Sequence, residues 1–320
     1  MKNINLQKKN CEMVNKNLQD LRDAFFDQIF YLAQNDKNVV IVTNDMDIFS
    51  LRKFKEKFPD RFYNMGVAEQ NMINFACGLA SEGRKVIVYG ILPFLVYRCL
   101  EQIKFNLCSM NLPVAIVGVG TGYSFSYDGP THHATHDIAV LNSLPEINIY
   151  NPSTPKNAKL LAKEISMSKK PCFVRLDKGV FSNAGTYYNS FAGFDVLHEI
   201  SSINVISTGS ILKKIENIVQ DINKNATKVG LIDIYRIKPF PKSIINLLSK
   251  SKKLYVVEEN YSGSGLGSII AHYFAIFNIK IEITFFSIND IQSFKYGSRD
   301  WLLLQEGLSL SKLKKRLTDD

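Results

Sequence analysis

Three histidines crowd into one short stretch of this sequence. His132, His133 and His136 lie within "YDGPTHHATHD", residues 127–137, just behind a Gly-Pro turn. Imidazoles exchange protons near neutral pH, and two of them four residues apart on a helix can bind zinc. No HExxH pattern or cysteine ligand accompanies the pair, so we predict no metal site. A rigid loop that carries Asp128 and these histidines instead suits the hydroxyl and carbonyl groups of a sugar-like ligand.

A second group of candidate residues follows from the stretch "GVAEQNMINFACGLASEG". Its spacing predicts a helix that begins near Glu69 and ends at Gly83, which places the carboxylate in the first turn, where the helix dipole favours its ionised form. Phe94 begins the next predicted helix, "LPFLVYRCLEQIK", and Arg98 follows one turn later. An aromatic ring there can stack on a flat heterocycle. Taken alone, a Glu or Phe at such a position is more often an ordinary helix-start or core residue.

Alternating strands and helices are expected to position these residues. Strands are predicted at residues 38–43, 85–90, 114–120, 147–150 and 172–176. Strands that alternate with helical segments are typical of a parallel sheet covered by helices on both faces. The loops at the carboxyl ends of such strands converge, so Glu69, Phe94, His132 and Asp45 of the "NDMD" loop are expected to line one edge of the sheet.

A second α/β unit follows an irregular stretch. Residues 178–200 lose the periodic pattern and gather Gly, Ser and Asn, so we place the linker there. Further strands are predicted at residues 203–208, 228–234, 253–259 and 281–287. The predicted fold class is therefore α/β, with two consecutive three-layer domains, residues 1–185 and 186–320, each a mostly parallel sheet covered by helices.

Composition and charge argue against several classes of protein. The five cysteines lack any C-x-x-C spacing, which argues against a disulfide framework and predicts buried thiols. No signal peptide is evident, and the longest apolar run is about 12 residues against the ~20 that span a bilayer, so we expect a cytoplasmic protein without membrane contact. The net charge of +9 forms no basic stripe, so we expect no nucleic acid partner; anionic sugar phosphates suit this charge.

Several motifs occur in an order that resembles one enzyme family. The stretches "FPDRFYNMGVAEQNM", "PFLVYRCLEQI", "DGPTHH", "IYNPSTP" and "CFVRLDKG" are similar to the pyrimidine-binding domain of transketolases and their relatives, which use thiamine diphosphate. The stretches "STGS", "IDIYRIKPF", "VVEEN" and "GSGLGS" are similar to the C-terminal domain of that family. The resemblance runs from about residue 12 to residue 310.

The resemblance implies that a further part of the enzyme is encoded elsewhere. Full-length transketolases carry a diphosphate-binding domain ahead of these two, with a G-D-G motif and a downstream Asn that hold magnesium and the diphosphate, and no G-D-G occurs here. We therefore expect the C-terminal subunit of a split transketolase-like enzyme, active only with an N-terminal diphosphate-binding subunit in an α2β2 heterotetramer. The Mg²⁺ ligands are expected on that partner.

The resemblance also assigns roles at the cofactor. Glu69 would bond the pyrimidine N1′ of thiamine diphosphate and promote the tautomer whose nitrogen removes the C2 proton. Phe94 would stack on the pyrimidine ring, and Asp45 and Arg98 would lie beside the cofactor.

Further roles are implied on the substrate side. Asp128 and His132 would face the hydroxyls and carbonyl oxygen of a sugar, with His133 beside them. Arg175 matches a family arginine that holds the acceptor's phosphate. The sequence departs from the family at Gly120, where full-length transketolases carry another phosphate-contacting histidine. The size and phosphorylation of the substrate therefore stay open.

Three functions compete at this point. Transfer of a two-carbon ketol unit between sugars or sugar phosphates is the first expectation. A decarboxylating relative is the second, either a deoxyxylulose-phosphate-synthase-like enzyme or a 2-oxoacid dehydrogenase component, although "GPTHH" argues against the latter. A non-catalytic binding subunit is the third, and the presence of Glu69 argues against it.

Overall fold

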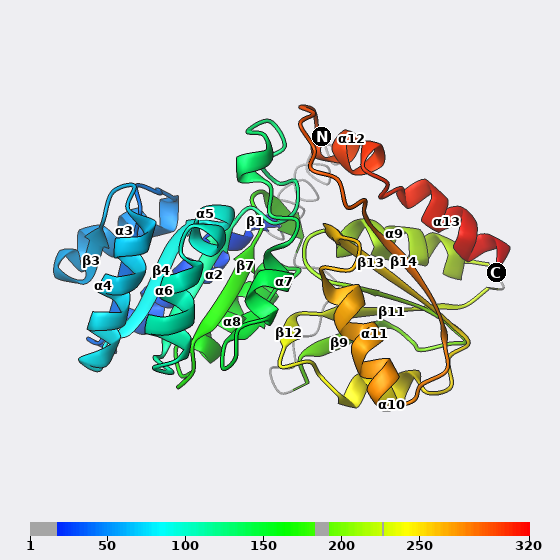
Figure 1. Cartoon of the computed structure of the whole chain (residues 1–320), viewed down its shortest axis with the longest axis horizontal. Coiled ribbons are helices and arrows are strands. Elements are labelled where there is room, and N and C mark those ends of the chain that lie inside the picture. Colours follow the sequence, from blue (N-terminus) through cyan, green and yellow to red (C-terminus); the bar gives the residue numbers. More distant parts are fainter. Residues whose placement is uncertain (1–17, 183–191, 226) are drawn as a thin grey trace, which may run out of the picture.

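The computed structural model describes residues 18–182, 192–225 and 227–320. Two α/β domains lie side by side, one on a seven-stranded sheet and one on a five-stranded sheet (Figure 1). Both sheets are mostly parallel and flanked by helices, so the predicted fold class is confirmed. The predicted domain boundary between residues 185 and 186 falls outside the described residues.

The first sheet is built from short buried strands. Its spatial order is β12 (Arg236–Lys238), β6 (Asn148–Tyr150), β7 (Cys172–Leu176), β5 (Val114–Val119), β4 (Lys85–Ile91), β2 (Val39–Thr43) and β3 (Phe62–Asn64). Neighbours pair in parallel from β6 to β3, whereas β12 is antiparallel to β6. Every residue of β2, VVIVT, is buried, which is expected for a parallel strand covered on both faces.

Helices connect and cover these strands. They are α2 (Leu21–Ala33), α3 (Phe49–Lys57), α4 (Glu69–Ser81), α5 (Leu92–Tyr97), α6 (Leu100–Gln102), α7 (Asp137–Asn142) and α8 (Pro155–Ile165), with 3₁₀ turns η1 (Pro59–Arg61) and η3 (Pro130–His132) and a π-helical turn η2 (Ile103–Cys108). The single continuous helix predicted to begin at Phe94 is wrong. Its path breaks at Cys99 (φ −109°, ψ 11°), and Gln70 Nε2 donates to the Arg98 carbonyl at 3.0 Å. The break leaves Arg98 beside Glu69.

The second domain has a simpler sheet. Its spatial order is β14 (Glu282–Ile288), β13 (Lys253–Tyr261), β10 (Ile203–Ser207), β11 (Val229–Ile234) and β9 (Phe194–His198). Its helices are α9 (Leu212–Asn223), α10 (Ser243–Leu248), α11 (Leu266–Ile276), α12 (Arg299–Gln305) and α13 (Leu310–Asp319). A separate pair joins β1 (Leu18–Asp20) to β8 (Val180–Ser182). The irregular linker predicted over residues 178–200 is therefore wrong at its described ends, because antiparallel pairing turns them into β8 and β9.

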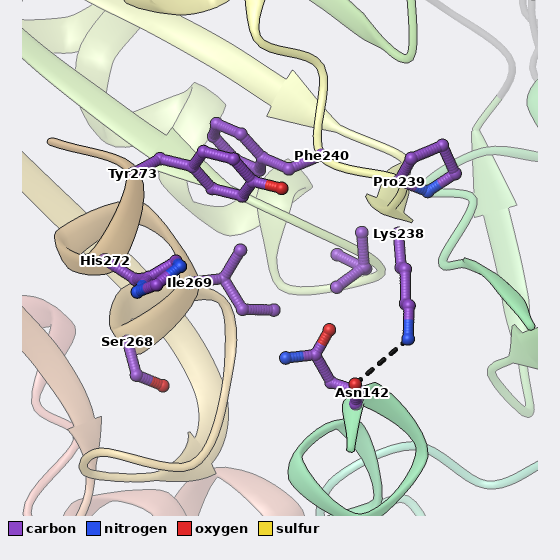
Figure 2. Close-up of a pocket in the computed structure, with 9 residues that line it drawn as sticks. Asn142, Lys238, Pro239, Phe240, Ser268, Ile269, His272 and Tyr273 are labelled. Carbon is purple, nitrogen blue, oxygen red and sulfur yellow. Dashed lines mark hydrogen bonds between the residues drawn. The ribbon is translucent and has the colours of Figure 1, made fainter. Parts of the chain in front are cut away.

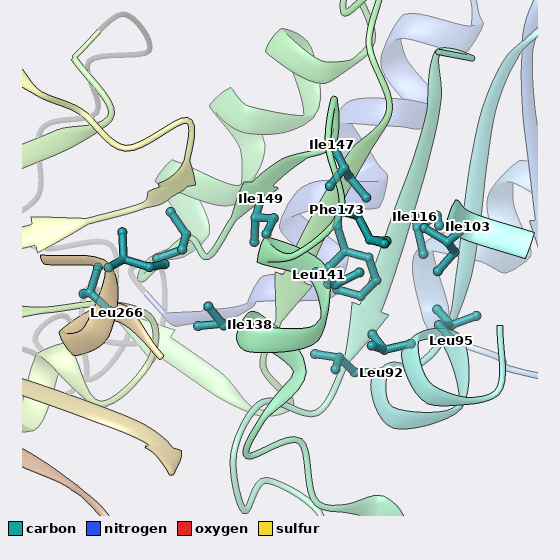
Figure 3. Packing of buried hydrophobic residues seen from close by; sticks show 14 of the residues in the cluster. Leu92, Leu95, Ile103, Ile116, Ile138, Leu141, Ile147, Ile149, Phe173 and Leu266 are labelled. Carbon is teal, nitrogen blue, oxygen red and sulfur yellow. The ribbon is translucent and has the colours of Figure 1, made fainter. Parts of the chain in front are cut away.

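The two domains share packing as well as a strand. One hydrophobic cluster includes Ile138, Leu141 and Ile149 of the first domain together with Leu266 of α11 (Figure 3). The strand β12 follows β11 in sequence and yet completes the edge of the first sheet. The hydrophobic core therefore continues across the domain junction, and residues close to the junction pack against both domains.

The remaining general expectations concern cysteines and membrane contact. Buried thiols are confirmed at Cys77, Cys99, Cys108 and Cys172, whereas Cys11 lies outside the described residues. Among the described residues, no helix combines the length and the apolar character that crossing a bilayer requires.

Candidate active site

Glu69 is a buried carboxylate at the first turn of α4. Its side chain is only 1% exposed. Asn44, which directly follows β2, donates from Nδ2 to Glu69 Oε1 at 2.8 Å, and Arg98 donates from Nη1 to Oε2 at 2.7 Å. Each carboxylate oxygen therefore has a side-chain donor in place.

The surroundings of Glu69 favour its charged form. Burial has the largest influence and by itself would raise the pKa of Glu69. Hydrogen bonds from its own backbone N–H, from Arg98 and from Asn44 outweigh burial, and the pKa of Glu69 lies below its ordinary value. A carboxylate, able to accept a hydrogen bond or a proton, is thus present at neutral pH.

An aromatic ring and an imidazole complete this cluster. The Arg98 guanidinium lies over the Phe94 ring, 4.7 Å from its centre, and the half-buried Phe94 meets His132 edge-on with ring centres 5.0 Å apart. His132 Nδ1 lies 3.0 Å from Thr131 Oγ1, so Nε2 is the ring nitrogen that this hydrogen bond does not use. The structure therefore brings Glu69, Phe94, Arg98 and His132 together.

Asp45 and Asp128 lie at exposed positions in the neighbouring loops. Asp45 adopts a left-handed conformation (φ 61°), and its carboxylate accepts from Asn64 Nδ2 at 2.7 Å, while its backbone N–H donates to Asn64 Oδ1 at 3.0 Å. Its side chain thus closes the loop after β2, and Asn44 is the residue of this loop that reaches Glu69. Asp128 lies in the loop that carries His132, and its negative charge acts on His133.

His133, a predicted substrate residue, does not reach the cluster. The residue is only 2% exposed, and its ring meets Tyr123 edge-on at 4.7 Å between centres. Burial lowers the pKa of His133, and neither ring nitrogen has a hydrogen-bond partner in the described part of the chain. The expected substrate contact of His133 is at odds with this placement, because the ring faces the domain junction.

Arg175 is also placed differently from the prediction. It is 2% exposed, and its guanidinium fork holds Asp137 through Nε–Oδ2 at 2.6 Å and Nη2–Oδ1 at 3.1 Å. The predicted phosphate contact is not supported, because the fork that would bind phosphate already binds a buried carboxylate. Lys178 is an exposed cation whose Nζ lies 5.1 Å from the centre of the Phe125 ring.

Phe125 explains why glycine occupies position 120. Gly120 has φ 98°, and a Cβ atom there would lie 2.2 Å from Phe125 Cε2. A histidine at this position, as full-length transketolases carry, has no room in this loop. The Phe125 ring also lies 6.0 Å from the His132 ring. Sequence reasoning missed Phe125 and Asn44, although Asn44 could have been found as the first residue after a buried strand at the site edge.

The cluster fits a flat heterocycle that carries N–H donors. Asn44 Oδ1 is a buried acceptor without a partner among the described residues, and it lies beside the Glu69 carboxylate. The absence of a Cβ at Gly90 makes room for this amide, since that atom would lie 2.5 Å from Oδ1. Two buried acceptors beside a half-buried phenyl ring are suited to the N–H groups and the flat face of an aminopyrimidine. The parts of the chain that the structure describes hold no group of three metal-ligating side chains.

A separate cavity of about 370 Å³ lies between α7 and α11, away from this cluster (Figure 2). Phe240 and Tyr273 stack along one wall with ring centres 4.7 Å apart, and Lys238 donates to the Asn142 carbonyl oxygen at 3.0 Å. The predicted site residues do not line this cavity.

Comparison with known proteins agrees with the two-domain division of the chain. Residues 18–182 match the family described as transketolase, pyrimidine binding domain, and residues 193–304 match transketolase, C-terminal domain. A solved structure described as a split gene transketolase, inactive beta4 tetramer, superposes with a TM-score of 0.82 at 22% identity, covering 94% of this chain and 97% of that one. That likeness shows a shared fold.

Two curated relatives differ in how much of them this chain covers. A subunit of apulose-4-phosphate transketolase from Phocaeicola vulgatus is 30% identical over 261 residues, which are 79% of this chain and 83% of the relative. 1-Deoxy-D-xylulose-5-phosphate synthase from Clostridium perfringens strain SM101 is 28% identical over 302 residues, which are 92% of this chain. The chain spans about half of the synthase, 48% of its length.

Proposed function

Because the chain belongs to the transketolase family, we propose that it is the C-terminal subunit of a two-subunit, thiamine-diphosphate-dependent enzyme that transfers a two-carbon ketol unit between sugars or sugar phosphates. The observation that carries the proposal is the buried Glu69 carboxylate, held by Asn44 and Arg98 beside Phe94 and His132. A subunit that only binds and does no chemistry has no need for this arrangement.

The residues around Glu69 would hold the pyrimidine end of the cofactor. When bound, thiamine diphosphate supplies the nucleophilic carbon that attacks the ketose carbonyl. The Glu69 carboxylate would accept a hydrogen bond from an N–H of the pyrimidine ring, and Phe94 would present its face to that ring. Arg98 would keep Glu69 charged, since its guanidinium is one of the donors that lower the pKa of that group. Asp45 is proposed to lie at the edge of the cofactor site without a direct role in the chemistry.

The residues of the loop before α7 would act on the sugar. His132 would donate a hydrogen bond from its ring to the substrate oxygen that gains negative charge, which stabilises the transition state more than the ground state. Asp128 is exposed in the same loop and would accept hydrogen bonds from sugar hydroxyls. Lys178, beside Phe125, replaces the buried Arg175 as the proposed contact for an acceptor's phosphate.

The partner would supply the diphosphate and magnesium contacts. The proposed assembly is an α2β2 heterotetramer with a diphosphate-binding subunit. Two relatives support a divided enzyme, one named as a subunit of its transketolase and one described as split gene. The second of these is described as inactive in its beta4 form, which supports the expectation that this chain alone is inactive.

Reconstitution with a diphosphate-binding transketolase subunit tests the proposal. We expect transfer of ¹³C from a ketose donor to an aldose acceptor only when both subunits, thiamine diphosphate and Mg²⁺ are present. Similarity to the synthase supports one alternative, decarboxylative condensation, so pyruvate with an aldehyde acceptor forms the second arm. Release of CO₂ without ketol transfer would replace the first proposal by the second. If the complex binds the cofactor but catalyses neither reaction, only the function of a non-catalytic binding subunit would remain.

A further inference from the structure

The segment that carries His132 is a closed loop whose two ends are fixed to each other. This histidine loop, residues 120–136, leads into α7 at the junction of the two domains (Figure 1). At its base Gly122 and Ala134 exchange two backbone hydrogen bonds, each 3.0 Å long. His132 lies beyond this base. Its ring meets the Thr131 hydroxyl and, in T-shaped contacts, the rings of Phe94 and Phe125, so its position depends on what holds the loop.

One side of the loop base is buried in the second domain. Tyr123 is fully buried and belongs to the hydrophobic cluster of that domain, with Ile211, Tyr261 and Leu302. Its ring forms an edge-on contact with His133, the residue next to His132. A first-domain loop therefore contributes a side chain to the second domain's core.

Arg299, the first residue of α12, binds the same side of the base. Its Nη2 donates to the Thr121 carbonyl oxygen at 3.4 Å and to Ser210 Oγ at 3.2 Å. Its Nη1 and Nε donate to Asp177 Oδ2 at 2.7 Å and to Glu259 Oε2 at 2.9 Å. The guanidinium thus ties the histidine loop, the end of β7 and the second sheet together, with two carboxylates offsetting its charge.

The other side of the base is held by the end of β13. The Thr135 carbonyl oxygen accepts from Tyr261 N at 2.8 Å and from Asn260 Nδ2 at 3.2 Å. The His136 ring is stacked between Tyr261 and Tyr97, with interplanar angles of 7° and 12°. Each domain supplies one of these two tyrosines.

The second domain also approaches the tip of the loop. A Cβ atom at Gly129 would lie 2.8 Å from Tyr296 Oη, so the tyrosine packs directly against the turn before His132. Contacts from the second domain thus reach both ends and the tip of the histidine loop, while His132 itself faces Phe94 of the first domain.

From these contacts we propose that the second domain sets the position of His132, and that Arg299 is a positioning residue that acts through the base of the histidine loop. The catalytic part of this inference rests on the proposed function of His132. Displacing a reacting group by about 1 Å can cost about 100-fold in rate, so loss of one base contact is expected to lower turnover although Arg299 touches no substrate.

Arg299→Ala in the assembled enzyme is the first test. We expect kcat to fall roughly 10- to 100-fold, with cofactor affinity within about threefold of wild type. Arg299→Lys is expected to be intermediate, because an ammonium can pair with a carboxylate but cannot form all four contacts. Low-millimolar guanidinium, below denaturing concentrations, is expected to restore part of the Arg299→Ala activity. Arg316→Ala, an exposed arginine on α13, is the matched control and is expected to keep full activity.

Hydrogen exchange in the chain alone is the second test and needs no activity. In Arg299→Ala we expect amides of residues 121–136 to exchange at least about tenfold faster, with α2 and α8 unchanged. Lower kcat with unchanged loop exchange would overturn the inference, and so would faster loop exchange with unchanged kcat. If Arg299→Ala does not fold, the same two readouts on Arg299→Lys decide. An inactive wild-type mixture would count against the proposed function, while the exchange result would still show whether Arg299 holds the loop.

Discussion

At the scale of single residues, the central feature is a carboxylate that burial and hydrogen bonding push in opposite directions. Glu69 is nearly inaccessible, and yet its pKa is lowered because Arg98, Asn44 and its own amide donate to it. A ligand N–H that joins these donors finds a charged acceptor already in place. Asn44 and Arg98 are therefore as much a part of the candidate site as Glu69.

His132→Ala tests the substrate side of this site. Because His132 is proposed to donate to the reacting oxygen, we expect kcat in the assembled enzyme to fall about 10²- to 10³-fold for phosphorylated and free acceptors alike, with unchanged cofactor affinity. His272→Ala, an exposed histidine on α11, is the matched control and is expected to behave as wild type. An unimpaired His132→Ala enzyme would return the histidine to a structural role.

Lys178→Ala and Arg175→Ala separate an exposed cation from a buried one. Lys178→Ala is expected to raise KM for a phosphorylated acceptor roughly tenfold and to leave a free sugar unaffected, since a charge-assisted contact is lost. Arg175→Ala is expected to cost about 3–5 kcal/mol in the free energy of unfolding, because Asp137 is left buried and unpaired. A stable Arg175→Ala protein with a selective phosphate defect would instead assign the phosphate contact to Arg175.

Which residues belong to the site could be predicted from the sequence better than which side chains each of them contacts. Glu69, Phe94, Arg98 and His132 could be chosen from residue type, spacing and resemblance, and the structure brings them together. The burial of Arg175 could not be read in this way, because its partner Asp137 lies 38 residues earlier in the chain and the pair forms only in the folded protein.

At the scale of elements, the loop before α7 depends on backbone positions that only glycine occupies without strain. Gly120 and Gly129 both have positive φ and both lack room for a Cβ atom, the first against Phe125 and the second against Tyr296. The loop is thus shaped by close packing as well as by turn conformation.

Gly120→Ala is expected to destabilise the protein by about 2–4 kcal/mol, from positive φ and from overlap with Phe125. Gly83→Ala is the matched control, since Gly83 has φ 82° with nothing within 4 Å of the added Cβ, and it is expected to cost only about 1 kcal/mol. Urea unfolding measures both. Equal losses would mean that Phe125 does not occupy the space over Gly120.

Strands could be predicted more completely than helices near the site. The runs that form β2, β4, β5, β6, β7, β10, β11, β13 and β14 are visible as apolar segments. The strands β3, β9 and β12 are not, because their polar and charged residues interrupt any apolar run and their pairing depends on distant neighbours. The break after α5 is also hidden, since the apolar spacing continues through Arg98.

At the scale of the whole molecule, buried polar groups join the domains. Asp233 of β11 accepts from Ser153 Oγ at 2.6 Å, across the junction. Burial, and to a smaller extent the negative charges of Asp195 and Glu216, raise the pKa of Asp233 to about 8. The hydrogen bond from Ser153 acts in the opposite direction and lowers the pKa, but does not offset burial. Asn157 donates from Nδ2 to the other carboxyl oxygen, Asp233 Oδ2, at 3.5 Å.

The pH dependence of stability follows from this raised pKa. Between about pH 4 and pH 8 the folded state holds a proton on Asp233 that the unfolded state has released. As the pH rises through this range, Asp233 therefore lowers the free energy of unfolding by about 1.4 kcal/mol per pH unit. Asp233→Asn removes the titration and is expected to flatten the profile from pH 5 to pH 8. Urea unfolding across this range measures it, and parallel profiles for both proteins would contradict the raised pKa.

The most direct test of the whole account is the exchange rate of the C2 proton of thiamine diphosphate, followed by NMR in a mixture of this chain with a diphosphate-binding subunit and Mg²⁺. We expect rapid exchange only in the mixture, because the proposed function places the pyrimidine-activating carboxylate and the diphosphate contacts on different chains. Glu69→Ala is expected to slow it by about 10²- to 10⁴-fold while the complex still assembles. Exchange at the wild-type rate in that variant would contradict the account, since Glu69 would then not be the group that activates the cofactor.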